Sequence, residues 1–296
     1  ALCKQIAEAN IPVEGSDEET VVPFVFAGSE ETYWNYLVFN WWGQISGKAE
    51  IDDFLKYEDK ACFDPSDATY GKAYAGLKQA YTLWYDLIAK NPSYVMKDCV
   101  GKTYMGAQLD FVNGKAAMMP NGQWLYNEMK KAAPEFRMKI MPTPTAPNAQ
   151  FPDTNYVVGS DQSIVIPATS TKQDLAMDFI RLMASDTAGN IFLKQANGTL
   201  GFNCDFDTSD ELSEFQQSIA TVQSNDITLF SDYSNTLLGK SGQISSVYAM
   251  KLPYNDAVSG YNSADPTNST YTPDRYFNDI KSTVNGQWQN WLDRIS

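Results

Sequence analysis

Signals for short strands alternate with signals for amphipathic helices along much of this 296-residue chain. The run Val21–Phe26 predicts a buried strand, and Ala116–Met119 predicts another. Between them, aromatic and aliphatic side chains recur at helical spacing from Tyr70 to Ile88, which predicts a helix that faces the core. This alternation favours an α/β fold, because helices that alternate with strands cover the faces of a sheet.

The second half of the chain continues the alternation around a proline-rich connector. Further strands are expected at Arg137–Met141, Tyr156–Val158 and Ser163–Ile166, and a last helix begins at Pro273. Three prolines lie within Pro142–Pro147, and such a segment is stiff and extended. We therefore expect the chain to cross between two lobes at this connector.

The composition excludes several classes of function. The chain has no histidine, which removes Ser-His and Cys-His catalysis, His-ligated metal sites and histidine pH switches. A formal net charge of -14 repels phosphate backbones and anionic lipid. No apolar run reaches the ~20 residues that a membrane span needs. We expect no nucleic-acid partner, no metal ion and no cofactor.

The four cysteines lie at positions 3, 62, 99 and 204, and none of them forms a C-x-x-C pair. A metal or thioredoxin-like site is therefore not expected. An even number of cysteines permits disulfides in an oxidising compartment, whereas their wide spacing is equally consistent with free, buried thiols. The sequence leaves both alternatives open.

The segment Phe111–Trp124 combines a helix, a glycine cap, a short strand, a glycine turn and a tryptophan at a helix N-terminus. Such a turn brings Trp124 and free backbone N–H groups to one edge of a sheet, where α/β proteins bind ligands. The segment resembles the extracellular solute-binding proteins of ABC importers, in the carbohydrate-binding group that includes maltose-binding protein. It fits the family pattern F-x-x-G-x-x-A-M-x-x-x-G-x-W at every fixed position.

Other stretches resemble the same family in the expected order. They are Arg137–Pro144, Val158–Pro167, Ser170–Met183, Ser185–Asn190 and Gly198–Gly201. Upstream, Glu31–Trp34 is similar to a stretch that touches sugar in maltose-binding protein. The resemblance covers most of residues 1–205 and is much weaker beyond them.

The resemblance implies a two-lobe α/β fold of the periplasmic-binding-protein type. The chain begins inside the family pattern, so we expect it to be N-terminally truncated, with the first part of the N-terminal lobe absent. Residues 1–143 would form the first part of the C-terminal lobe. Residues 144–204 would return to the N-terminal lobe, and residues 205–296 would supply the helices and C-terminus of the C-terminal lobe.

The resemblance also implies a function without chemistry. Members of this group are bacterial receptors that close their lobes around a carbohydrate, here expected to be an oligosaccharide, and deliver it to the membrane permease of an ABC importer. We expect a monomer outside the cytoplasmic membrane, either a lipid-anchored lipoprotein or free in a periplasm. Two alternatives stay open: a protein of the same fold that binds a non-sugar solute, and a glycoside hydrolase that uses two carboxylates.

A sugar offers an apolar C–H face to aromatic rings and a ring of hydroxyl groups to polar side chains. The candidates for stacking are Trp124, Tyr33, Trp34 and Trp41, and those for hydroxyl contacts are Glu31, Asn121, Gln123 and Asp161. Each has a structural alternative. The rings of an aromatic-rich helix can pack in the core, and the two acidic residues can serve a helix start or a turn.

Overall fold

The computed structural model describes residues 1–156, 164–200, 204–208, 211–223, 228–230 and 251–295. The chain divides into two compact units. Unit 1 consists of residues 1–120, 143–159 and 227–296, and unit 2 consists of residues 121–142 and 160–226. One boundary, between residues 142 and 143, lies inside the predicted proline-rich connector. The assignment of residues 1–143, 144–204 and 205–296 to lobes stays a prediction.

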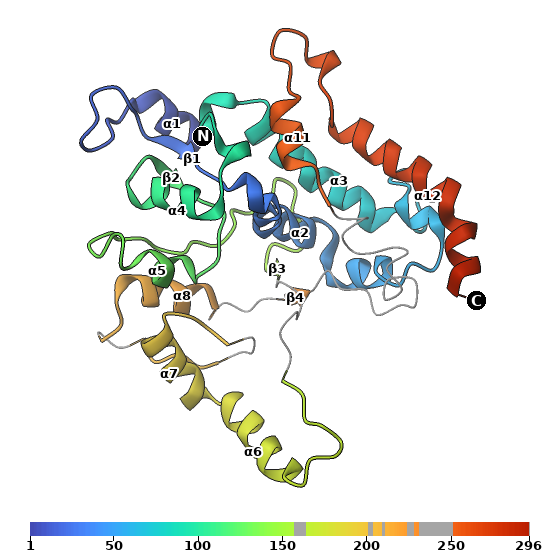
Figure 1. Cartoon of the computed structure of the whole chain (residues 1–296). Coiled ribbons are helices and arrows are strands. Elements are labelled where there is room, and N and C mark those ends of the chain that lie inside the picture. Colours follow the sequence, from blue (N-terminus) through green and yellow to red (C-terminus); the bar gives the residue numbers. More distant parts are fainter. Residues whose placement is uncertain (157–163, 201–203, 209–210, 224–227, 231–250, 296) are drawn as a thin grey trace. The chain divides into compact units, whose positions relative to one another are not determined.

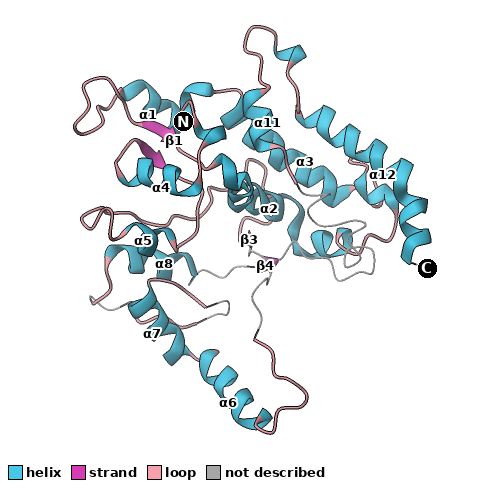
Figure 2. Ribbon diagram, viewed as in Figure 1, coloured by secondary structure: helices cyan, strands magenta, loops and turns pink. Residues whose placement is uncertain are grey.

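Unit 1 combines helices with short strands (Figure 1), and Figure 2 distinguishes the two kinds of element by colour. Its α-helices are α1 (Leu2–Ala9), α2 (Asn35–Phe54), α3 (Lys72–Trp84), α4 (Tyr104–Val112), α11 (Tyr254–Ser259) and α12 (Pro273–Ile295). Its strands are β1 (Val22–Phe24), β2 (Ala116–Met118), β3 (Thr154–Tyr156) and β4 (Thr228–Phe230). Short helical turns of other types are η1 (Gly28–Trp34), η2 (Lys60–Phe63), η3 (Tyr85–Ala89), η4 (Pro92–Tyr94), η5 (Cys99–Gly101) and η6 (Pro266–Asn268).

The described strands form two parallel pairs. In the first pair, Val22 of β1 lies opposite Ala116 of β2. In the second pair, Thr154 of β3 lies opposite Thr228 of β4. Parallel pairing needs a long crossover connection, which the intervening helices supply. The strands predicted near residues 21 and 116 are therefore confirmed, although both are shorter than expected. Of the strand predicted at Tyr156–Val158, Tyr156 lies in β3, and residues 157–158 lie outside the described residues.

An aromatic core holds unit 1 together. The indole of Trp34 lies 5.7 Å from that of Trp84 at an angle of 67°. Trp84 also lies 4.6 Å from the ring of Tyr254 and stacks on Tyr81 at 5.6 Å, measured between ring centroids. Edge-to-face and offset-stacked rings are favoured over face-to-face sandwiches. These contacts join η1, α3 and α11, so the predicted core role of the α3 aromatic stripe is confirmed.

Helices α2 and α3 approach each other closely, and a glycine makes this possible. A Cβ atom on Gly76 would lie 1.9 Å from Oγ of Ser46 in α2. Nearby, the indole N–H of Trp42 donates a hydrogen bond to the carbonyl oxygen of Ala73 over 2.6 Å. Since a buried indole N–H needs an acceptor, this bond fixes the position of α2 along α3.

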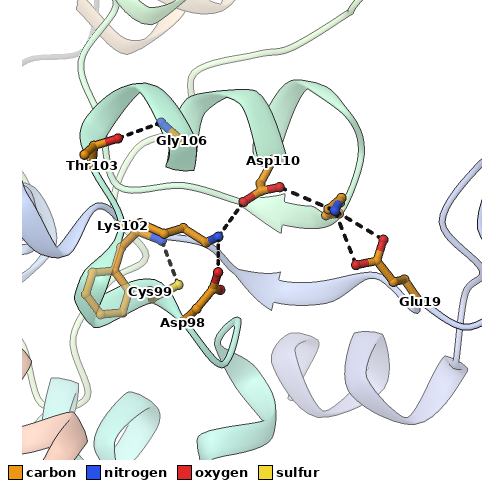
Figure 3. Close-up of polar contacts among 9 residues, drawn as sticks. Glu19, Asp98, Cys99, Lys102, Thr103, Gly106 and Asp110 are labelled. Atoms are coloured by element: carbon orange, nitrogen blue, oxygen red, sulfur yellow. Dashed lines mark hydrogen bonds and ion pairs between the residues drawn. The ribbon is translucent and has the colours of Figure 1, made fainter.

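Figure 3 shows a chain of charges that runs from Asp98 and Lys102, before α4, through Asp110 of α4 to Glu19. The ammonium group of Lys102 lies 2.7 Å from the carboxylate of Asp110 and 2.5 Å from that of Asp98. Asp110 and Glu19 both face Lys115, at 3.6 Å and 3.2 Å. Burial alone would lower the pKa of Lys102, but the two carboxylates raise it above the usual lysine value. The network fixes the strand that leads into residues 121–124.

Unit 2 contains the helices α5 (Leu125–Met129), α6 (Gln173–Met183), α7 (Asp186–Ala196) and α8 (Glu214–Gln223). Its apolar core is a small cluster of side chains from residues 193 and 212–220: Leu193, Leu212, Phe215, Ile219 and Ala220. Met138 and Ile140 pack against this cluster, and Ile140 N–H donates to Oγ of Ser218 over 3.0 Å. The strand predicted at Arg137–Met141 is therefore wrong: the segment is a loop that packs on α8.

Helix α6 and the segment before it expose their apolar side chains. Leu175, Phe179 and Leu182 lie at i, i+4 and i+7, and their residues are 68%, 55% and 58% exposed. Ile164 and Val165 are also exposed, and residues 164–166 form no strand. The strand predicted at Ser163–Ile166 is wrong over its described residues, because no neighbouring strand covers these side chains.

All four cysteines are free thiols. Cys3, Cys62 and Cys99 are buried, and burial raises the pKa of the Cys99 thiol to about 11. A thiol with a raised pKa is a poor nucleophile, which fits a structural role. Of the two alternatives that the sequence left open, the structure shows the thiols. None of the described helices is long and apolar enough to cross a membrane.

The exposed face of α6 gives a prediction. Leu175→Gln combined with Phe179→Gln should lower the fluorescence of the hydrophobic dye ANS bound to the chain, because the variant removes exposed apolar surface. The free energy of unfolding in urea should change by less than about 0.5 kcal/mol per site, as at other exposed positions. Leu193→Ala, at a buried position of the same unit, should instead cost ~2–5 kcal/mol. If the free energy of unfolding of the Leu175→Gln, Phe179→Gln variant fell by a similar amount, the apolar face of α6 would be shown to be covered.

Candidate functional site

The turn at residues 121–124 begins unit 2 and presents Trp124. Oδ1 of Asn121 accepts a hydrogen bond from Gly122 N–H over 2.7 Å, which tightens the turn. Helix α5 then starts directly after Trp124, whose carbonyl oxygen accepts from Glu128 N–H over 3.1 Å. The predicted sequence of short strand, glycine turn and helix is therefore present, with the tryptophan at the N-terminus of the helix.

Gly122 is required by the indole ring that lies against it. A Cβ atom at this position would lie 2.0 Å from Cζ3 and 2.2 Å from Cη2 of Trp124. Only a glycine admits the ring this close to the backbone. Trp124 is nevertheless 39% exposed, and it is the one exposed tryptophan of the seven, all of which lie in the described ranges. The turn thus holds one side of the indole and leaves part of the ring to solvent.

Hydrogen bonds join this turn to the segment that follows α7. Nε2 of Gln123 lies 3.4 Å from both the carbonyl oxygen and Oγ1 of Thr199. The amide of Asn127 donates to the carbonyl oxygen of Ala196 over 2.6 Å and accepts from the amide of Asn197 over 2.8 Å. Asn197 adopts a left-handed conformation with φ 52, as residues that end helices often do. Two turns far apart in sequence therefore form one surface of unit 2.

Four of the other sequence candidates, Tyr33, Trp34, Trp41 and Glu31, lie in unit 1, where each makes structural contacts. Trp34 is 0% exposed and lies in the aromatic core. Tyr33 is half-buried, with its ring 5.6 Å from that of Tyr36. Glu31 accepts a hydrogen bond from the backbone N–H of Asn255 over 2.7 Å, which places its carboxylate in the first turn of α11. A negative charge stabilises that end of a helix.

Trp41 is 7% exposed and anchors the proline-rich connector within unit 1. Its indole N–H donates to the carbonyl oxygen of Pro144 over 2.8 Å. Oε1 of Gln44, one turn further along α2, accepts from Ala146 N–H over 2.7 Å. The backbone oxygen of Gln44 accepts from the N–H groups of Gln150 and Phe151, both over 2.9 Å. These bonds give Trp41 a structural task that accounts for its burial.

Three of the eight candidates therefore lie together on unit 2: Asn121, Gln123 and Trp124. Asp161 lies outside the described residues. No group of three or more Asp, Glu or Cys side chains in the described ranges could hold a metal ion. The surface offers a partly exposed indole beside side-chain amides. This combination suits a ligand that has both an apolar face and hydroxyl groups.

Three residues that support this surface were not predicted: Asn127, Asn197 and Gln216, whose side-chain nitrogen bonds to Oδ1 of Asn197 over 2.9 Å. Two signals were available to find them. Ser213 and Gln216 fit the spacing of a capping box, with a Gln three residues after a Ser. The pair Asn197-Gly198 is typical of a helix end. Neither signal by itself indicates that the two helix ends meet the turn at residues 121–124.

Comparisons with solved structures show the fold. The chain is similar to a chitin oligosaccharide binding protein, with a TM-score of 0.54 and 15% identity over 90% of this chain and 60% of that one. It is similar to the apo-form of RafE from Streptococcus pneumoniae, with a TM-score of 0.57 and 17% identity over 88% and 59%. A third similar structure is the putative binding protein MsmE from Bacillus subtilis, in an open conformation, with a TM-score of 0.53 and 12% identity over 93% and 60%.

The chain thus spans about three fifths of the length of these structures. They confirm the predicted two-lobe α/β fold of the periplasmic-binding-protein type. A search among curated proteins finds no significant match. A family model described as "Bacterial extracellular solute-binding protein" matches residues 29–220, which is more than half of the chain. The chain therefore belongs to the family of bacterial extracellular solute-binding proteins.

Proposed function

We propose that the chain is part of a receptor that binds a carbohydrate, an oligosaccharide in particular, outside the cell and delivers it to the permease of an ABC importer. The family supports the extracellular binding role. In this proposal the receptor is a monomer, lipid-anchored or periplasmic, whose lobes close around the ligand, and it performs no chemistry. The observation that carries the carbohydrate class is the exposed indole of Trp124 beside Asn121 and Gln123.

An indole face and side-chain amides match the two faces of a sugar. The C–H face of a pyranose ring packs on the indole, which contributes burial of apolar area at roughly 25 cal/mol per Å². The amides can donate and accept hydrogen bonds with hydroxyl groups in the ring plane. Micromolar binding corresponds to ~8 kcal/mol, so several contacts of this kind are needed. Trp124 would supply the central stacking contact.

A thermal-shift screen tests the proposed function. The chain should gain stability with one class among monosaccharides, maltose, raffinose and chitin oligosaccharides, and none with amino acids or short peptides. A ligand at 100 times its Kd adds ~2.7 kcal/mol, which is a visible rise in the midpoint. Trp124→Ala should abolish the rise when each chain is compared with its own ligand-free midpoint, which this change lowers because more than half of the residue is buried. Stabilisation by a peptide or amine would favour the non-sugar alternative, and released reducing sugar would favour the hydrolase.

A second prediction concerns the glycine beneath the indole. Gly122→Ala should weaken binding of the sugar found in that screen about tenfold, a change of ~1.4 kcal/mol, because the new methyl group displaces the ring of Trp124. Titration calorimetry measures the affinity. Gly106→Ala is the matched control, since its Cβ atom would meet nothing closer than 3.4 Å. Equal affinities for Gly122→Ala and the original chain would show that the ring position is irrelevant to the ligand.

A further inference from the structure

Gln216 is a buried polar side chain that connects two helix ends of unit 2. It lies in the first turn of α8, and its exposed fraction is 8%. Its Oε1 accepts from Ser213 N–H over 2.9 Å, and Oγ of Ser213 accepts from Gln216 N–H over 3.2 Å. This reciprocal capping box fixes the side-chain oxygen of Gln216. The amide nitrogen is therefore left to donate in a set direction.

That direction leads to the C-terminal end of α7. Nε2 of Gln216 lies 3.2 Å from the carbonyl oxygen of Leu193 and 3.0 Å from that of Lys194. It also lies 2.9 Å from Oδ1 of Asn197. The last carbonyl groups of a helix need donors from outside the regular helical pattern. The carbonyl of Leu193 accepts from Asn197 N–H over 3.2 Å, and Gln216 gives it a second donor. Gln216 also gives Lys194 a donor and orients the amide of Asn197.

Asn197 connects Gln216 to Asn127 in α5. Because its Oδ1 faces Gln216, its Nδ2 points the other way and donates to Oδ1 of Asn127 over 2.8 Å. Nδ2 of Asn127 in turn donates to the carbonyl oxygen of Ala196 over 2.6 Å. The amide of Asn197 thus bonds to Gln216 through its oxygen and to Asn127 through its nitrogen. The amide of Asn127 bonds to Asn197 through its oxygen and to Ala196 through its nitrogen. The three side chains form a continuous chain of hydrogen bonds.

The chain of amides ends one helical turn from Trp124. Helix α5 has only five residues, which is too short to be stable without tertiary contacts. Leu125 and Met129 bury one side of it, and apolar burial by itself is non-directional. The bonds of Asn127 are directional. Together with the ring of Tyr126, which stacks on that of Phe215 with centroids 4.4 Å apart, they set how α5 is rotated and, with it, where the indole of Trp124 lies.

We propose that Gln216, Asn197 and Asn127 form a positioning relay that holds the indole of Trp124 in the orientation used for ligand stacking. None of the three contacts the ligand in this proposal. The ligand role of Trp124 rests on the proposed function. The orientation of the Trp124 ring by the relay does not rest on the proposed function. The relay and the ligand role of Trp124 can therefore be tested separately. The relay predicts that affinity is sensitive to residues on α7 and α8 that lie behind the binding surface.

Fluorine NMR of the ligand-free chain labelled with 5-fluorotryptophan tests the relay. Trp124→Phe assigns the Trp124 resonance by its disappearance. Asn197→Gly removes the middle amide but keeps the left-handed backbone that a glycine adopts readily, so the chain should still fold. It should shift or broaden the Trp124 resonance and leave those of buried Trp34 and Trp84 unchanged. Asn127→Ala should produce the same change.

Asn190→Ala is the matched control on the same helix. Its amide donates to the carbonyl oxygens of Asp186 and Asp205 and to Sγ of Cys204, and it accepts from Asp207 N–H. None of these bonds leads toward α5. It should leave the Trp124 resonance in place. An unchanged Trp124 resonance in Asn197→Gly and Asn127→Ala would overturn the relay, as would an equal shift in Asn190→Ala. Loss of sugar affinity by about tenfold in Asn197→Gly, equivalent to ~1.4 kcal/mol, would extend the relay to ligand binding.

Discussion

The side-chain amide bonds of Asn127, one from the amide of Asn197 and one to the carbonyl oxygen of Ala196, position the turn through which unit 2 presents its exposed tryptophan. Among the described residues of this unit the main apolar cluster is small, and helix α6 adds no buried residue to the interior. Apolar burial supplies free energy but little direction, whereas a hydrogen bond fixes an angle as well as a distance. The directional amide bonds between helix ends therefore fix the relative positions of α5 and the end of α7, and the turn with Trp124 depends on them.

Unit 1, in contrast, is held together by a large aromatic core. Its many aromatic rings pack against one another from η1, α2, α3, α11 and α12, so rings such as Trp34 and Trp84 stabilise the unit and are not accessible to a ligand. Trp41 also stabilises unit 1, because its indole N–H donates a hydrogen bond to the carbonyl oxygen of Pro144 in the connector. Although the chain is rich in aromatic residues, Trp124 is its one exposed tryptophan. Its position therefore indicates where a ligand could stack.

The sequence predicted the fold class, the main helices and the turn at residues 121–124, because helical periodicity, capping residues and glycine positions are local signals. Strands expected at Arg137–Met141 and Ser163–Ile166 did not form over their described residues. Apolar runs of this length show that a segment can be a strand but do not supply a partner. The roles of Glu31 and Gln216 were not readable for a related reason: each bonds to a backbone group distant in sequence. Such contacts arise only when the chain has folded.

In the proposed receptor, a sugar stacks on the exposed face of Trp124. A saturation-transfer NMR experiment measures this contact: the indole protons of Trp124 are irradiated, in a chain whose other tryptophans are deuterated, with a sugar that the chain binds. Transfer should reach the C–H protons on one face of one sugar ring, and it should be lost in Trp124→Ala. Absence of transfer in the original chain, with the sugar still bound, would place the ligand elsewhere and rule out stacking on Trp124.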